Sequence, residues 1–256
     1  MLKKFGFLFI SIAVCAVFLS TNYQNHTFVE ENDLWMEDGK SDNSIVTEEM
    51  FNRIIDIGYE IYKPFADANN ESLRINNKWS DSTVNANCSR FFGSVTINMF
   101  GGLARRPEVN PEGFALVLCH ELAHAYGGRP YISAWRKMSA EGQADYYGAM
   151  ECHHQVMDAL ELEGYDIEPT AYMEATCEEN FEGDRAGICI RDLVGGQSLG
   201  HLLSVIKEEA IPNYETPDPT VVDRTLTSYP ETVQCRLDTY FNGSLGKNRP
   251  ACWFKD

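Results

Sequence analysis

Residues 110–128 read NPEGFALVLCHELAHAYGG, the stretch with the strongest structural and chemical signals in the chain. It predicts one well-bounded helix, because Asn110 is a good N-cap, Pro111 suits the first turn, and the Gly127-Gly128 pair ends it. The residues between these signals are largely apolar, so we expect the helix to be buried. Polar side chains in a buried helix need partners, since burying them alone is costly.

The polar residues of this helix form a metal-binding pattern. His120 and His124 are four residues apart and share one face, so both imidazoles can reach a single ion. Glu121 lies about 100° around the helix, where it can take a proton from a metal-bound water. This is the HExxH arrangement of zinc proteases, in which zinc activates water and polarises the scissile carbonyl. The alternative is a buried histidine pair satisfied by hydrogen bonds.

A third ligand is predicted in the segment that follows. A metzincin would place a histidine ten residues after His120, but that position is Pro130. A second helix is predicted from near Ser139, which would cap it, to about residue 162. Glu141 in its first turn can complete a His₂Glu zinc site with water in the fourth position. Asp145, one turn later, can orient a ligand histidine. Alternatively, the two acids only complement the helix dipole.

These motifs resemble the gluzincin metallopeptidases of the HtpX and CAAX prenyl-protease type. HELAH followed by Glu141 and Ala144-Asp145 carries the resemblance, and the sequences at 84–86, 227–230 and 236–237 are weaker matches. It implies a zincin-like α+β fold, in which the motif helix and a second ligand helix pack on a small mixed sheet before a mostly helical C-terminal half. Tyr229 stands where the family has histidine, so Tyr229 or Arg236 is expected to stabilise the oxyanion. The transmembrane helices of the best-known members are missing, so membrane-embedded prenyl-peptide cleavage is not implied.

The remaining elements are predicted from periodicity and punctuation. A helix begins after Thr47 and is expected to end at Pro64. Short strands are predicted at 73–75, 83–87 and 94–100, and helices at 171–178, 199–209 and 232–241. Residues 212–219 are expected to form an ordered surface connection. His153 and His154, which could suggest a second metal site, are expected to be exposed helix residues.

The N-terminus predicts export. Lys3 and Lys4 precede an apolar run over 5–20, so residues 1–20 are predicted to be a signal peptide or an uncleaved N-terminal anchor. Residues 21–44 are expected to be a flexible lead-in, and 45–256 the zinc metallopeptidase domain. The protein would then be periplasmic or secreted, and its seven later cysteines would form disulfides rather than bind metal. Cys177 with Cys189 and Cys235 with Cys252 are plausible local loops; an odd count leaves at least one thiol free.

The charge balance limits the partners. The chain has 21 Lys and Arg against 38 Asp and Glu, a net charge of −17, which excludes a nucleic-acid binder. Contact with a membrane is expected only through an uncleaved N-terminal segment. The predicted activity is zinc-dependent hydrolysis of peptide bonds in a peptide or protein substrate, with one Zn²⁺ per chain. One alternative is a disulfide-stapled exported binding or assembly protein with a structural zinc site; another is a zinc hydrolase acting on an ester or amide. No sequence feature indicates an oligomeric state.

Overall fold

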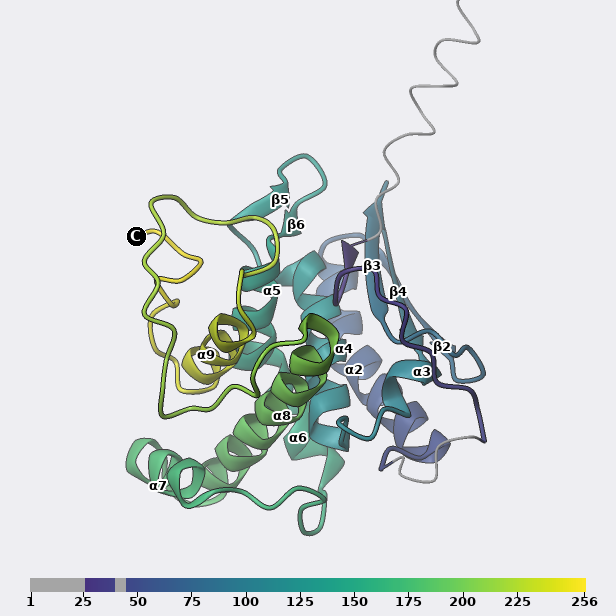
Figure 1. Cartoon of the computed structure of the whole chain (residues 1–256). Coiled ribbons are helices and arrows are strands. Elements are labelled where there is room, and N and C mark those ends of the chain that lie inside the picture. The colour runs from purple at the N-terminus through teal and green to yellow at the C-terminus, as the bar shows by residue number, and fades with distance from the viewer. Residues whose placement is uncertain (1–25, 40–44) are drawn as a thin grey trace, which may run out of the picture.

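The computed structural model describes residues 26–39 and 45–256, and its architecture is mixed α+β (Figure 1). A small sheet forms one side of the molecule and helices form the other. Helix α4 (Pro111–Tyr126) lies between them and packs against β3, β4, α2, α5 and α8. The predicted signal peptide or anchor, residues 1–20, lies outside the described residues. Within the described residues no helix is both long and apolar enough to cross a bilayer.

The sheet has the strand order β1-β3-β4-β2. Strands β3 (Ala86–Phe91) and β4 (Ser94–Phe100) form an antiparallel hairpin, β2 (Ser72–Lys78) is parallel to β4, and β1 (His26–Thr27) is antiparallel to β3. A separate hairpin joins β5 (Tyr131–Ser133) to β6 (Met138–Ser139). The mixed sheet was expected, but β1 was not.

The strand predicted at 83–87 forms with different bounds, because β3 begins only at Ala86 and continues to Phe91. Thr83 forms an isolated bridge with Trp35, and its N–H donates to the Asp81 carboxylate in a local turn. The Asn85 side chain binds the backbone of Val29 from both its oxygen and its nitrogen. Side-chain bonds of this kind compete with a regular ladder and delay the start of the strand.

Helix α2 (Glu48–Ala68) starts as predicted, with the Thr47 hydroxyl accepting from Met50 N. It does not end at Pro64, which lies inside the helix. Pro64 is exposed, so the carbonyl that loses its partner can bind water. Tyr62 and Ala66 are buried on either side and hold the last turn against the core.

Helix α4 confirms the prediction for 110–128. The Asn110 side chain accepts from Gly113 N at 2.8 Å, Pro111 opens the helix, and Gly128 follows it with φ of 77°. Residues 111–125 are buried on every face. The motif helix is therefore the centre of the molecule rather than one of its surfaces.

The second ligand helix is segmented into α5 (Glu141–Tyr147), a π-helical stretch η1 (Gly148–His153) and α6 (His154–Leu160). Ser139 does not cap it, because Ser139 lies in β6 and its hydroxyl donates to Gly128 O. Ala140 takes the N-cap position, without a side-chain bond. The helix was expected near Ser139, and it begins two residues later.

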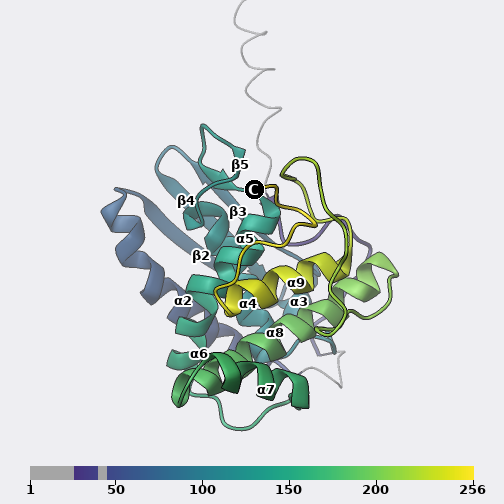
Figure 2. The ribbon, with the colours of Figure 1, turned by 90° about the vertical axis from the view of Figure 1, so that its left-hand side faces the viewer.

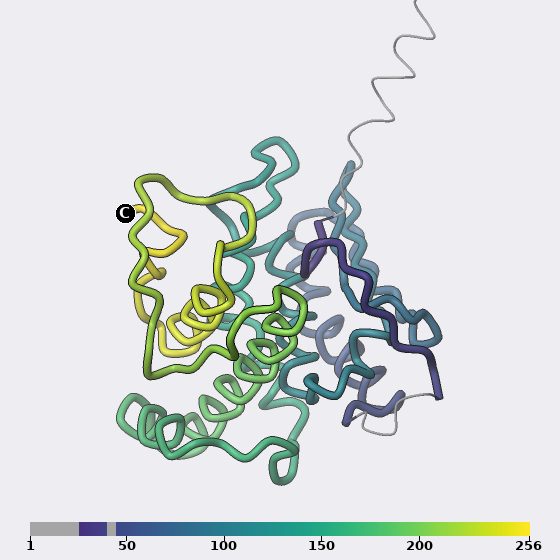
Figure 3. Tube along the Cα trace, in the orientation of Figure 1, coloured from purple at the N-terminus to yellow at the C-terminus, as the bar shows by residue number. Residues whose placement is uncertain are grey.

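The C-terminal half is mostly helical, as expected: α7 (Ala171–Asn180), α8 (Asp184–Lys207) and α9 (Val233–Ser244), with a short α3 (Gly101–Ala104) after the sheet. Helix α8 begins well before the predicted 199. Its glycines lower helix propensity, but Gly195 lets α8 approach α4, since a Cβ there would lie 2.9 Å from Glu112 O. Figure 2 shows α8 and α9 at the front of the helical side, and the connection that includes 212–219 follows the outer surface in Figure 3.

Three disulfides link the helical half: Cys119–Cys152, Cys177–Cys189 and Cys235–Cys252. The two local loops are the pairs that the sequence made plausible, whereas the bond from α4 to η1 joins residues 33 apart in the sequence. Among the described cysteines, Cys88 is free and buried. Three disulfides fit an oxidising compartment.

Candidate metal centre

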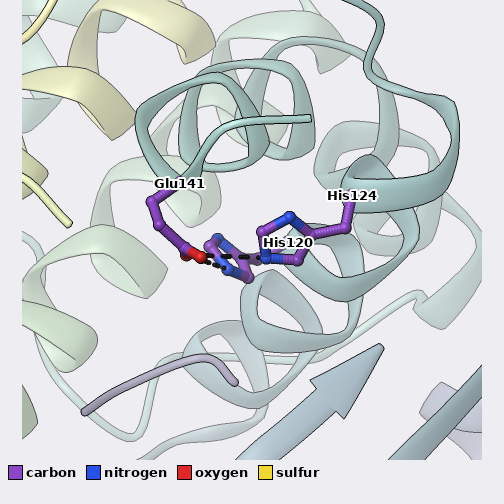
Figure 4. A group of neighbouring side chains, drawn as sticks. All are labelled: His120, His124 and Glu141. Carbon is purple, nitrogen blue, oxygen red and sulfur yellow. Dashed lines mark ion pairs between the residues drawn. The ribbon is translucent and has the colours of Figure 1, made fainter. Parts of the chain in front are cut away.

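Three side chains from two helices converge at the centre of the molecule (Figure 4). His120 and His124 come from α4 and Glu141 from the first turn of α5. Glu141 Oε2 lies 3.4 Å from His120 Nε2 and 3.5 Å from His124 Nε2. All three side chains are buried. The structure thus brings together the three residues that the sequence predicted as ligands.

The two imidazoles are oriented by bonds at their other nitrogens. His120 Nδ1 lies 2.7 Å from Asp145 Oδ1, and His124 Nδ1 lies 2.9 Å from the carbonyl oxygen of Ser139. Each acceptor favours a proton on Nδ1, which leaves Nε2 with a lone pair directed toward Glu141. The role predicted for Asp145, orienting a ligand histidine, matches its contact with His120. The role of Ser139 could not be read from sequence, because it uses a backbone oxygen.

The site fits a tetrahedral ion. His120 Nε2, His124 Nε2 and Glu141 Oε2 are buried and have no hydrogen-bond partner among the described residues. Ligands about 2.0–2.1 Å from a tetrahedral ion lie about 3.3–3.4 Å from one another, which matches the two spacings measured here. Distances of 3.4 and 3.5 Å are long for direct hydrogen bonds. A cation between the three atoms would satisfy all of them.

Glu121 lies beside this set without belonging to it. Its side chain is fully buried, and neither carboxylate oxygen has a hydrogen-bond partner among the described residues. Burial raises the pKa of Glu121 to about 8, against the lowering effect of His120. A buried carboxyl with no structural partner is costly, so its presence beside three convergent ligands points to chemistry.

The electrostatics of the other acids differ from those of Glu121. Burial alone would raise the pKa of Glu141, but His124 and His120 outweigh it and lower the pKa to about 2. Burial likewise opposes the lowering of the Asp145 pKa, and Arg236 and His120 prevail. Glu141 and Asp145 are therefore held as carboxylates, whereas burial makes Glu121 easier to protonate than a free glutamate.

Arg236 and Tyr229, predicted as oxyanion groups, are engaged elsewhere in this structure. Arg236 donates from Nε and Nη2 to both oxygens of Asp145, at 2.9 and 2.8 Å, and from Nη1 to Phe28 O at 3.0 Å. The Tyr229 hydroxyl donates to Thr27 O at 2.6 Å. Arg236 acts through Asp145 on His120, which makes it a positioning residue here. Neither group has a donor directed at the ligand set.

The structure corrects the expectation for His153. It is buried rather than exposed: Nδ1 lies 2.8 Å from Asp192 Oδ1 and Nε2 lies 2.8 Å from Glu112 O. These contacts tie η1 to α4 and α8. Asp192 and Glu112 are remote from His153 in sequence, so no local pattern could have revealed them.

A second cluster of possible ligands comprises Asp218, Cys235 and Cys252. The two cysteines are bonded to each other, so they offer no thiolate to an ion. Of the two clusters found within the described residues, only the His₂Glu set fits a metal.

Two residues beside the metal centre were missed by sequence reasoning because they belong to the expected flexible lead-in. The Phe28 ring meets the His120 ring edge-on with centroids 5.3 Å apart, and the His26 ring lies 5.6 Å from that of His124. Residues 26–36 are ordered against the sheet, contrary to the expectation for this part of 21–44. The only sequence signal was the i, i+2 spacing of two rings, too short to predict a strand.

Comparisons of the chain with protein-family models, with curated proteins and with solved structures give no match.

Proposed function

We propose that this protein is a zinc-dependent endopeptidase of the gluzincin type, with His120, His124 and Glu141 as ligands of one zinc ion. Two imidazoles and a carboxylate are a ligand set that zinc favours, and three protein ligands leave a position for water or substrate. The observation that carries the proposal is Glu121, a buried carboxyl without a partner beside three convergent ligand atoms. The resemblance to HtpX-type enzymes rests on the same residues.

When bound, zinc would supply Lewis-acid polarisation of the scissile carbonyl and a more acidic water. The protein supplies the proton transfers. Glu121 accepts a proton from the attacking water as the water oxygen bonds to the carbonyl carbon. It then delivers that proton to the amide nitrogen as the C–N bond breaks, so that a carboxylic acid and an amine leave. No hydrogen bond ties down the Glu121 carboxyl among the described residues, so it is free to take and return that proton.

The other residues hold the ligands in place. Asp145 fixes the Nδ1 proton of His120, and Arg236 fixes Asp145. The proposed substrates are peptides or proteins. The proposed compartment is an exported one, since the helical half contains three disulfides. The net charge of −17 argues against nucleic-acid substrates.

A structural zinc site in a binding or assembly protein is the second candidate, and complete burial of the ligands favours it. Glu121 argues against it, because a structural His₂Glu site has no use for an adjacent carboxyl. In a purely structural site, replacing Glu121 by an uncharged residue would change stability alone.

The test is Glu121→Gln in the full chain. We expect it to keep one zinc per chain by elemental analysis and to lose cleavage of an unfolded protein substrate by about 10²–10⁴-fold, the usual contribution of a general base. Glu178→Gln, an exposed change on α7, is the matched control and should leave both readings unaltered. Cleavage by Glu121→Gln at the native rate, with zinc bound, would sink the mechanism.

A further inference from the structure

The candidate active site is closed in this structure. His120, Glu121 and His124 are completely buried, and Glu141 is 3% exposed. A peptide carbonyl cannot reach groups covered to this degree. Part of the cover is the segment His26, Thr27, Phe28 and Val29, called the N-terminal strap below; it is the purple segment beside β3 in Figure 1.

One side of the strap is held by the sheet. His26 and Thr27 pair antiparallel with Cys88 and Asn87 of β3, and Phe28 N donates to Ala86 O at 3.0 Å. The strap thereby occupies the outer edge of β3, which would otherwise present unpaired backbone groups beside the metal centre.

Its other side is held by the helical half. Tyr229 donates to Thr27 O and Arg236 donates to Phe28 O, so two successive carbonyls of the strap are bound. Tyr229 and Arg236 are the two residues expected to bind an oxyanion. The strap therefore spans from the sheet to the C-terminal half, and its carbonyls engage the two residues to which the family resemblance gives an oxyanion role.

The side chains of the strap face the ligands. His26 and Phe28 are two residues apart and point to the same face, toward His124 and His120. Phe28 is fully buried between the His120 ring and the Arg236 guanidinium, which lies 4.7 Å from its ring centroid. The Phe28 ring therefore excludes water and substrate from the His120 side of the ligand set.

The attachment is confined to a short segment of the chain. Strand β1 has only two residues, and Glu30 directly after the strap is exposed. A small cavity lined by Val29, Tyr229 and Leu203 borders it on one side. Farther along, Met36 N donates to Ser82 O, so the chain stays tethered when the strap lifts. Lifting the strap breaks the β1–β3 pairing, the bonds of its carbonyls to Tyr229 and Arg236, and the contacts of Val29 with Asn85. All of these can re-form, because the chain remains attached.

We infer that the N-terminal strap is an intramolecular inhibitor, which occupies the site as a peptide and must leave before a substrate can enter. The inhibition of cleavage rests on the proposed function, whereas the covering of the ligand residues by the strap does not. If the strap is closed in about nine chains of ten, the apparent affinity for substrate is reduced about tenfold, and releasing it restores that factor.

A reversible lock tests this in the full chain. His26 lies opposite the free Cys88 in the β1–β3 register. Cα atoms of directly paired antiparallel residues are about 4.5–5.5 Å apart, within the range that a disulfide spans. His26→Cys, made together with Cys15→Ser, should therefore close the strap on oxidation, and His26→Ser in the same background is the control. Phe28→Ala is the opposite change, which frees the His120 face.

Two readings are taken: the rate at which a chromogenic chelator removes zinc, and the rate of peptide cleavage. We expect the oxidised lock to slow both by about tenfold or more relative to His26→Ser, and Phe28→Ala to speed both by a similar factor relative to the exposed change Glu31→Ala. If Phe28→Ala does not fold, the comparison of oxidised His26→Cys with His26→Ser is sufficient to test the inhibitory role of the strap.

The outcomes separate the two proposals. Equal zinc removal and equal cleavage with the strap locked and unlocked would overturn the strap and leave the peptidase standing. Zinc removal that depends on the lock, with no cleavage by any zinc-loaded variant, would support the strap as a gate and refute the peptidase.

Discussion

At the scale of single residues, the side chains of the candidate metal centre differ in whether their polar atoms have hydrogen-bond partners. Asp145 accepts from His120 and from two nitrogens of Arg236, and all three side chains are buried. The chain Arg236–Asp145–His120 sets the direction of His120 Nε2. Glu121, by contrast, has no partner at all among the described residues. The site is therefore rigid where it would hold an ion and unsatisfied where it would move a proton.

Asp145→Asn tests this chain of contacts. The change leaves Arg236 buried without a charge partner, which costs about 3–5 kcal/mol of unfolding free energy. It also removes the carboxylate that fixes His120, and zinc affinity should fall about 10–100-fold. Urea unfolding and competition with a chelator measure the two effects. Asp158→Asn, an exposed change on α6, is the control, and an unaltered zinc affinity in Asp145→Asn would contradict the positioning role.

At the scale of elements, the position of α5 decides whether Glu141 reaches the histidines. Helix α5 is short and packs against α4 and α9. Gly142, next to the ligand, faces the buried Trp253: a Cβ there would lie 2.3 Å from the indole. The close approach of Trp253 to the α5 backbone thus places Glu141, and no side chain larger than hydrogen fits at 142.

Gly142→Ala should therefore displace α5. Overpacking against a buried ring costs about 1–3 kcal/mol, and moving Glu141 away from the histidines lowers zinc affinity. Isothermal titration with zinc and a thermal melt give the two readings. Gly187→Ala is the matched control, because a Cβ at Gly187 of α8 meets nothing within 4 Å. If both variants bind zinc alike, the placement of Glu141 does not depend on this contact.

At the scale of the whole molecule, the candidate metal centre lies where the sheet and the helical half meet. Helix α4 contacts both the sheet and the C-terminal helices, and the Cys119–Cys152 bond ties it to η1. Without an ion, three ligand atoms at this junction stay buried and unsatisfied. The ion is then expected to contribute to global stability as well as to chemistry.

Removing the ion should therefore lower the unfolding temperature of the entire described domain in one transition. A ligand present at about 1,000 times its dissociation constant stabilises the native state by about 4 kcal/mol, and chelation removes that contribution. Differential scanning calorimetry with and without a chelator measures it. The melt of Glu141→Ala, which has lost a ligand, should not respond to the chelator. An equal response in both proteins would place the ion elsewhere.

The sequence features that predict the central helix are local, because they lie within that helix or directly beside it. The cap, the proline, the glycine pair and the i, i+4 histidines of α4 all act within one helix, and α4 formed as predicted. Helix spacing likewise indicated that Glu141 and Asp145 would lie near the two histidines, and they do. Tertiary packing overrode the local signals in two helices. Pro64 lies inside α2 because Tyr62 and Ala66 are buried around it. The glycines of α8 are tolerated because α4 packs closely there.

The sequence by itself indicated the candidate ligand residues and the buried motif helix, and it made two of the disulfides plausible, because each depends on residues near one another in the chain. Only the tertiary structure decided that Arg236 serves Asp145, that His153 is buried against Asp192, and that residues 26–29 cover the metal centre. Those contacts join segments far apart in sequence, up to 208 residues for Arg236 and Phe28. Their energy comes from burial and pairing that exist only once the sheet and the helical half have come together.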